Sequence, residues 1–210
     1  MENIDKTTKS QKDLTLDLVK WWMEAFSKDE REYMVSQYLP IGRDTRERFL
    51  KNLAENSNPN AYRFLGGLAT WFRDKEHATI KDRIYKKIVE ISKEYPLCGP
   101  GFFGGRHYTT YVTDIEILKK QDRAEEVERL LLNLIDAIEE ESRNTGLGVA
   151  PGYYQELAIL YRKGKDFKKE VEILERFARQ QHAPGVLPPR LLDRLEKAKD
   201  LKAKSDAKYG

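Results

Sequence analysis

Residues 153–178 read YYQELAILYRKGKDFKKEVEILERFA, and this stretch decides the fold. Its apolar positions form two series at intervals of one to four residues: Tyr154, Leu157, Ala158 and Tyr161, then Phe167, Val171, Leu174 and Phe177. The tripeptide Gly164-Lys165-Asp166 lies between the two series. Spacing of this kind predicts two amphipathic helices joined by a tight turn.

A second hairpin of the same kind precedes this one in the chain. Moving the quoted stretch back by 43 residues places Tyr154 on Tyr111, Tyr161 on Leu118, Phe167 on Ala124, Leu174 on Leu131 and Phe177 on Leu134. The turn of this earlier hairpin falls at residues 121–123. Two like hairpins in tandem are typical of an α-solenoid, in which each unit buries its face on the next.

The quoted stretch resembles a tetratricopeptide repeat. The resemblance is carried by the aromatic Tyr154, the Leu157-Ala158 pair, Tyr161, the tight turn before Phe167, and Leu174. Residues 115–131 match more loosely, and the whole resemblance covers residues 107–181. It implies an all-α, solenoid-like fold that binds other proteins. Two features depart from the family: Glu170 and Phe177 replace its preferred alanines, which predicts wider helix packing, and the period exceeds its usual length of about 34 residues.

The rest of the chain is predicted to be helical, without a clear repeat. The sequence divides into a flexible N-terminus (1–12), an N-terminal helical lobe (13–96), a Gly-rich linker (97–106), the hairpins with a C-terminal helix (107–204), and a tail (205–210). Within the lobe, helices are expected over residues 14–26, 44–53 and 60–74. A short helix is expected to begin after Asp29, which would cap it, and another helix should contain the series Ile80, Ile84, Ile88 and Ile91. No stretch alternates long enough to predict a strand.

The helix over residues 14–26 has too many apolar side chains for one narrow stripe. Such a helix needs cover on more than one side, from the rest of the fold or from a second subunit. We therefore predict a homo-oligomer formed through residues 14–26.

Composition limits the class of protein. Of the 210 residues, 40% are apolar and 35% are charged, which is typical of helices that bury one stripe and keep the rest solvated. The net charge of +3 argues against a strongly basic nucleic-acid face. The chain has a single cysteine and a polar start at residues 1–5, which predict a cytoplasmic protein. No apolar run approaches the ~20 residues of a membrane span, so we predict no membrane segment.

The resemblance also implies a binding groove. In tetratricopeptide arrays the first helix of each hairpin lines it, which here points to Val112, Glu116, Lys119 and Lys120, then Gln155, Ile159, Arg162 and Lys163. Lys119 and Lys120 fall at positions equivalent to Arg162 and Lys163, so stacked hairpins would align four cations. A row of cations in a concave groove favours an acidic protein segment or a phosphate backbone. The plain alternative is that these cations only offset the dipoles at helix C-termini.

Other residues suggest weaker sites. Arg106 and His107 follow the Gly-rich loop at a helix start, where backbone N–H groups can hold an anion, although a plain linker explains the loop as well. Arg190, Arg194 and Lys197 share one face of the C-terminal helix, which is the best place for a nucleic-acid contact. The run Glu139-Glu140-Glu141 reads as a solvated helix face.

These observations give one leading hypothesis and two alternatives. The leading one is a non-enzymatic interaction module that binds a protein segment in a basic helical groove. The first alternative is a nucleic-acid-associated accessory protein that uses the basic C-terminal face. The second is an enzyme that uses Cys98 and His107, which would require the two side chains to lie within hydrogen-bond reach. The pattern predicts no cofactor, and His77 and His182 have no second ligand at helical spacing, so it predicts no metal site.

Overall fold

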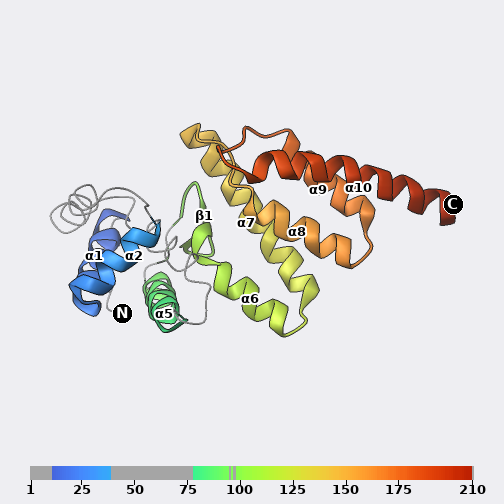
Figure 1. Ribbon diagram of the computed structural model, residues 1–210. Coiled ribbons are helices and arrows are strands. Elements are labelled where there is room, and N and C mark those ends of the chain that lie inside the picture. The colour runs from blue at the N-terminus through green and yellow to red at the C-terminus, as the bar shows by residue number, and fades with distance from the viewer. Residues whose placement is uncertain (1–10, 39–77, 95, 97, 210) are drawn as a thin grey trace, which may run out of the picture. The chain divides into compact units, whose positions relative to one another are not determined.

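A computed structural model describes residues 11–38, 78–94, 96 and 98–209 (Figure 1). Most of these residues are helical, as predicted for an all-α chain. The chain divides into an N-terminal unit, residues 1–98 with 104–113, and a C-terminal unit, residues 99–103 with 114–210. The helices predicted over 44–53 and 60–74, and most of the predicted flexible N-terminus, lie outside the described residues.

The N-terminal unit contains the helices α1 (Gln11–Ala25), α2 (Lys28–Tyr38) and α5 (Ala78–Glu94). The apolar residues of α5 are buried where the isoleucine series predicts, at Ile84, Ile88 and Ile91. Arg83 links α5 to the end of α1, since it donates a hydrogen bond to the carbonyl oxygen of Ala25 and lies 4.1 Å from the centroid of the Phe26 ring.

Four apolar side chains of the segment 14–26 are buried within the chain: Leu18, Val19, Trp22 and Phe26. Part of the broad apolar face that the sequence shows is therefore covered without a second copy, while Leu16, Trp21, Met23 and Ala25 are half-buried. The homo-oligomer through residues 14–26 stays a prediction.

The cap of α2 differs from the expected one. Ser27, not Asp29, precedes the helix, and its hydroxyl accepts a hydrogen bond of 3.2 Å from the backbone N–H of Glu30. The Glu30 carboxylate accepts in return from the Ser27 N–H at 2.7 Å. This reciprocal pair is a capping box, whose Ser-x-x-Glu spacing is visible in the sequence.

The Gly-rich segment contains two short strands, β1 (Phe102–Phe103) and β2 (Arg106–His107), followed by a 3-10 turn at Tyr108–Thr110. The expectation of no strand is thus wrong in this segment. Strands of two residues leave no alternating pattern in a sequence, so periodicity could not reveal them.

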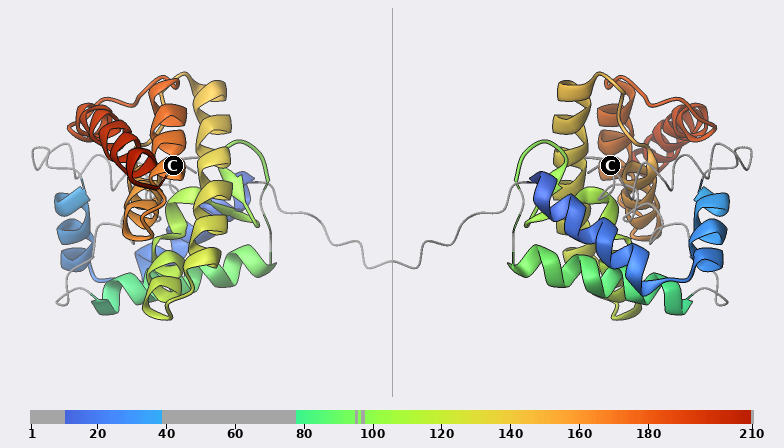
Figure 2. Two further views of the ribbon diagram at one scale, coloured as in Figure 1. Left: turned by 90° about the vertical axis from the view of Figure 1, so that its right-hand side faces the viewer. Right: turned by 90° about the vertical axis from the view of Figure 1, so that its left-hand side faces the viewer.

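The C-terminal unit carries α6 (Val112–Lys120) from residue 114 on, and then α7 (Ala124–Thr145), α8 (Gly152–Lys163), α9 (Phe167–Ala178) and α10 (Leu187–Tyr209). Helices α7, α8 and α9 lie side by side in sequence order, and α10 packs on α9 (Figures 1 and 2). Their core contains the fully buried residues Leu131, Leu134, Leu157, Leu174 and Phe177. Helix α10 continues beyond residue 204 into the segment expected to be a tail.

The two hairpin turns of this unit share one backbone geometry at an offset of 43 residues. Asp122 and Lys165 both adopt the left-handed conformation, with φ of 55° and 58°. The N–H groups of Arg123 and Asp166, which follow them, donate to the carbonyl oxygens of Leu118 and Tyr161 at 3.1 and 3.0 Å. Both helices therefore end in the same six-residue closing turn, which is an internal likeness beyond the side-chain pattern.

A short parallel bridge ties together the two connections that follow the hairpins. The N–H of Val149 donates to Gln181 O at 2.7 Å, and the N–H of Ala183 donates to Val149 O at 3.2 Å. Gly148 permits this close approach, since it has φ of 81° and a Cβ there would lie 2.4 Å from the carbonyl carbon of His182.

Candidate functional site

A small pocket lies between the α6–α7 turn and α8, within the C-terminal unit. Its volume is about 160 Å³, and its lining residues are Lys119, Asp122, Arg123, Ala124, Val127, Glu156, Ile159, Leu160 and Lys163. The floor is apolar, and the rim carries three cations and two carboxylates. Two of the predicted groove cations, Lys119 and Lys163, thus line one pocket, together with the predicted groove residue Ile159.

The rim charges differ in their pairing. Lys119 forms an ion pair with Glu156 of α8, and Arg123 forms one with Glu126 of α7. Lys120 and Lys163 are exposed and make no ion pair within the described part of the chain. Each therefore offers a solvated charge to a ligand.

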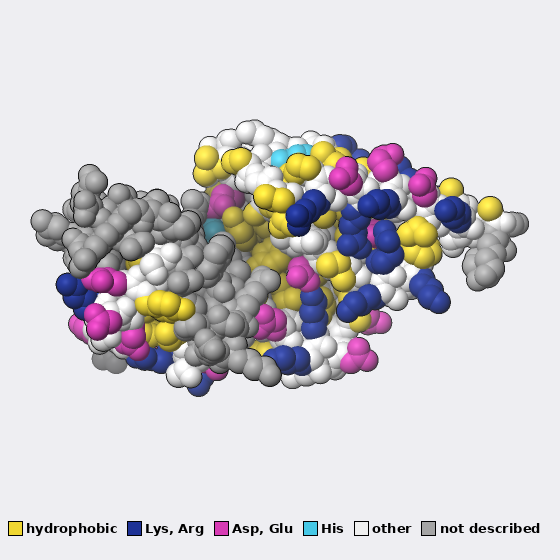
Figure 3. Space-filling model, viewed as in Figure 1, with side chains coloured by type: hydrophobic (Ala, Val, Ile, Leu, Met, Phe, Trp, Pro, Cys, Tyr) yellow, Lys and Arg dark blue, Asp and Glu magenta, His cyan; other side chains and the backbone are white. Residues whose placement is uncertain are grey.

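Two further exposed lysines follow Lys163 in the chain, and the helical periodicity of the sequence does not point to them. Lys165 and Lys168 belong to the α8–α9 turn and its first helical residues, and both are exposed and make no ion pair with any described residue. Figure 3 shows several Lys and Arg side chains gathered over the helices of this unit. The signal in the sequence is the run RKGKDFKK at 162–169, in which five cations outnumber one carboxylate.

The other predicted groove residues do not line the pocket. Arg162 forms an ion pair with Glu170, whose side chain is fully buried. Glu116 and Gln155 are half-buried on α6 and α8. The row of four cations is thus reduced to two solvated ones, Lys120 and Lys163, at equivalent positions of the two hairpins.

The basic face of α10 is partly neutralised. Arg194 forms an ion pair of 2.7 Å with Glu170 and donates to the carbonyl oxygen of Ala158 at 3.0 Å, so it holds α10 against the hairpin. Lys199 lies 3.2 Å from a carboxylate oxygen of Glu196. Arg190 and Lys197 remain exposed.

The residues beside the Gly-rich loop have local structural roles. Arg106 is buried and lies 3.9 Å from the centroid of the Tyr111 ring. His107 is 1% exposed, and its Nδ1 lies 2.9 Å from the hydroxyl of Thr109. Cys98 is exposed. The described residues contain no cluster of three or more potential metal ligands.

Two polar clusters, one buried around Glu139 and one partly exposed around Glu128, join α7, α8 and α9, and the sequence did not predict them. The Tyr154 hydroxyl donates to Glu139 at 2.7 Å, and Arg176 donates to the same carboxylate at 2.8 Å. The Tyr161 hydroxyl and Lys169 likewise share Glu128, at 3.0 and 2.9 Å.

Each cluster thus takes a tyrosine from α8, a carboxylate from α7 and a cation from α9. The reading of Glu139 as part of a solvated face is wrong, because its side chain is buried in the first cluster. Burial first, and then the hydrogen bond to Glu139, raises the pKa of Tyr154, so its hydroxyl stays protonated and donates.

We expect acid to weaken this unit through Glu139. Burial alone would raise the pKa of Glu139, but hydrogen bonds from Arg176 and Tyr154 lower it below its ordinary value of 4.5. Because the folded-state pKa is the lower one, the carboxylate adds stability above about pH 4.5, and this is lost as pH falls through the folded pKa. The free energy of unfolding in urea, measured from neutral pH to about pH 3, should fall less for Glu139→Gln than for the wild type. Equal losses would contradict this role.

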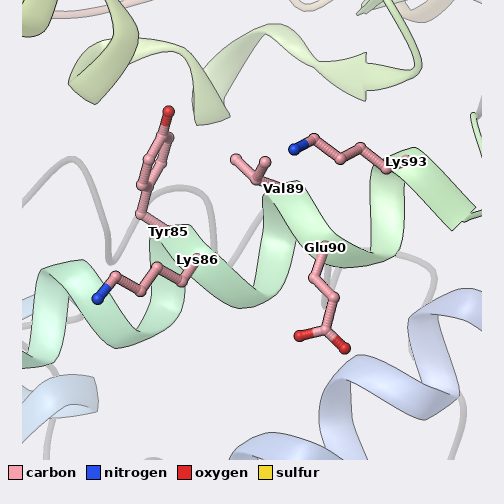
Figure 4. A pocket seen from close by; sticks show the side chains of 5 residues that line it. All are labelled: Tyr85, Lys86, Val89, Glu90 and Lys93. Carbon is pink, nitrogen blue, oxygen red and sulfur yellow. The ribbon is translucent and has the colours of Figure 1, made fainter.

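A second, more open hollow lies along α5. Its volume is about 600 Å³, and the residues that line it are Tyr85, Lys86, Val89, Glu90 and Lys93, all from one helix. Figure 4 shows Tyr85, Val89 and Lys93 on one side of the helix and Glu90 pointing away from them. The polar groups do not converge, so the hollow has no geometry for a specific ligand.

In comparisons with known proteins, no family model, curated protein or solved structure matches this chain. Among the described residues, no helix has both the length and the apolar character needed to cross a membrane.

Proposed function

We propose that the protein is a non-enzymatic interaction module whose C-terminal unit binds an acidic segment of a partner protein. The observation that carries the proposal is the pocket with its apolar floor and with Lys163, exposed and without an ion pair to any described residue, at its rim. Three more exposed lysines without ion pairs in the described ranges are near these lining residues in the chain: Lys120, which follows Lys119, and Lys165 and Lys168, which follow Lys163. Solvated cations around a concave apolar floor attract carboxylates and leave room for a side chain. Within this proposal the protein acts in the cytoplasm.

A tetratricopeptide-like repeat is part of the proposal. It is supported by the resemblance of residues 153–178 and by the shared geometry of the two turns, with Asp122 and Lys165 at corresponding places. The repeat explains why Lys120 and Lys163, which are 43 residues apart, occupy the same position in consecutive hairpins.

A peptide suits the site better than a small molecule does. The pocket of about 160 Å³ is smaller than the ~300–1,000 Å³ of sites that enclose a drug-sized ligand. A nucleic-acid contact on α10 is less favoured, because Arg194 and Lys199 are engaged by carboxylates of the chain itself.

Charge reversal tests the proposed site. We expect the Lys120→Glu/Lys163→Glu variant to bind a pool of labelled Glu-rich peptides at least about tenfold more weakly than the wild type, measured by fluorescence anisotropy. The matched control is Arg190→Glu/Lys197→Glu, which changes the net charge equally on exposed positions of α10 and should change affinity less than about twofold.

Two outcomes would overturn the proposal. Equal peptide binding by the wild type and the Lys120→Glu/Lys163→Glu variant would remove the pocket rim as the site. Salt-sensitive binding of single-stranded DNA that only the α10 variant loses would favour the nucleic-acid alternative instead.

A further inference from the structure

The apolar floor of the pocket suits one apolar side chain of a ligand, and we call this space the socket. Its apolar lining comes from Ala124 and Val127 of α7 and from Ile159 and Leu160 of α8, and Val127 is 1% exposed. A cavity of about 150 Å³ lined by aliphatic and aromatic groups can hold a benzene molecule. The pocket of about 160 Å³ therefore has room for one aromatic ring or one branched aliphatic side chain.

Two of the three cations that line this pocket form ion pairs, and the third forms none within the described part of the chain. Lys119 with Glu156 connects α6 to α8 across the pocket, and Arg123 with Glu126 fixes the turn. These pairs cancel most of the charge that a ligand would meet on those sides. Two lining charges form no ion pair with any described residue, Lys163 of α8 and Asp122 of the α6–α7 turn. A carboxylate of a ligand is therefore attracted to the α8 side of the opening, where Lys163 lies, and repelled from the turn side.

We infer, on the basis of the proposed function, that the pocket anchors one apolar side chain of the partner segment while an adjacent Asp or Glu contacts Lys163. The ligand class is thus an acidic segment of a partner protein with a single apolar anchor. The apolar group supplies affinity through burial, and the carboxylate supplies orientation and selectivity.

Three synthetic peptides test the two parts separately. The first has one Phe between Glu residues in a Gly-Ser background, the second replaces Phe with Ser, and the third replaces each Glu with Gln. With the full-length chain we expect the second and third peptides each to bind about tenfold or more weakly than the first, measured by isothermal titration calorimetry.

A pocket-filling variant tests where the apolar side chain sits. Ala124 is exposed at the first position of α7, so Ala124→Phe should occupy the socket and leave every rim cation unchanged. It should weaken binding of the Phe peptide about tenfold but leave the weak binding of the Ser peptide unaltered. The control is Ala203→Phe, at an exposed alanine of α10, which should bind like the wild type. Thermal unfolding of both variants verifies that they are folded.

The outcomes separate this inference from the proposed function. If Lys163→Glu and the Gln peptide weaken binding but Ala124→Phe and the Ser peptide do not, the anchor is overturned and the acidic-segment function stands. If replacing Phe with Ser in the peptide weakens binding by the same factor for the wild type and for Ala124→Phe, the apolar contact lies elsewhere and the anchor is overturned. If neither charge change has an effect, both proposals fall.

Discussion

Glu170→Ala should lower the free energy of unfolding by about 3 kcal/mol, near the lower end of the range for breaking a buried ion pair. The Glu170 side chain is fully buried, and its two carboxylate oxygens separately accept from Arg162 and Arg194. Alanine would leave two guanidinium groups of α8 and α10 facing a space without a counter-charge. The loss stays near the lower end because these arginine side chains are 34% and 23% exposed and regain some water.

Urea unfolding at neutral pH measures this effect, and two variants sharpen it. Glu172→Ala removes an exposed carboxylate from the same helix and should change stability by less than about 0.5 kcal/mol. Glu170→Gln keeps the shape and one acceptor oxygen but not the charge. Its free energy of unfolding should therefore lie between those of Glu170→Ala and the wild type. Similar losses for Glu170→Ala and Glu172→Ala would show that the carboxylate does not hold α8 and α10 together.

The sequence marked position 170 as unusual but could not supply its partners. Tetratricopeptide repeats, which residues 153–178 resemble, prefer alanine at this place, so Glu170 predicts wider packing between the helices. The structure instead surrounds the carboxylate with Arg162, eight residues earlier, and Arg194, from the next helix, α10. The pairing depends on how α10 packs on α9, which no local pattern encodes.

The helices could be predicted from the sequence because their apolar periodicity is a local property of the chain. The isoleucine series gave α5, and the turns at 121–123 and 164–166 lie where they were expected. The state of each charged side chain was not readable, since it depends on neighbours from other helices. Of four aligned cations, Lys119 and Arg162 form ion pairs while Lys120 and Lys163 stay solvated, although all four look alike in the sequence.

Phe177→Ala should be the most damaging single substitution considered, with a loss of about 3–5 kcal/mol in the free energy of unfolding. The Phe177 side chain is fully buried in α9, and its ring centroid lies 5.1 Å from that of Tyr154 and 4.2 Å from that of the stacked His182 ring. Alanine would remove a large side chain from the core between α8 and α9 and leave a cavity beside the Tyr154–Glu139 hydrogen bond. Chemical denaturation at neutral pH measures the loss.

The same substitution tests whether this hairpin can pack as closely as a tetratricopeptide repeat, the family it resembles. That family prefers alanine at the position of Phe177. If α8 and α9 could close onto the smaller side chain, the loss would fall below about 2 kcal/mol, because the penalty depends on how far the site collapses. The ion pairs of Glu139 with Arg176 and of Glu128 with Lys169 hold the helices α7 and α9 at fixed places around α8. Because these contacts resist collapse, we expect the full loss, and Phe177→Leu, which leaves a smaller cavity, should cost less than half as much.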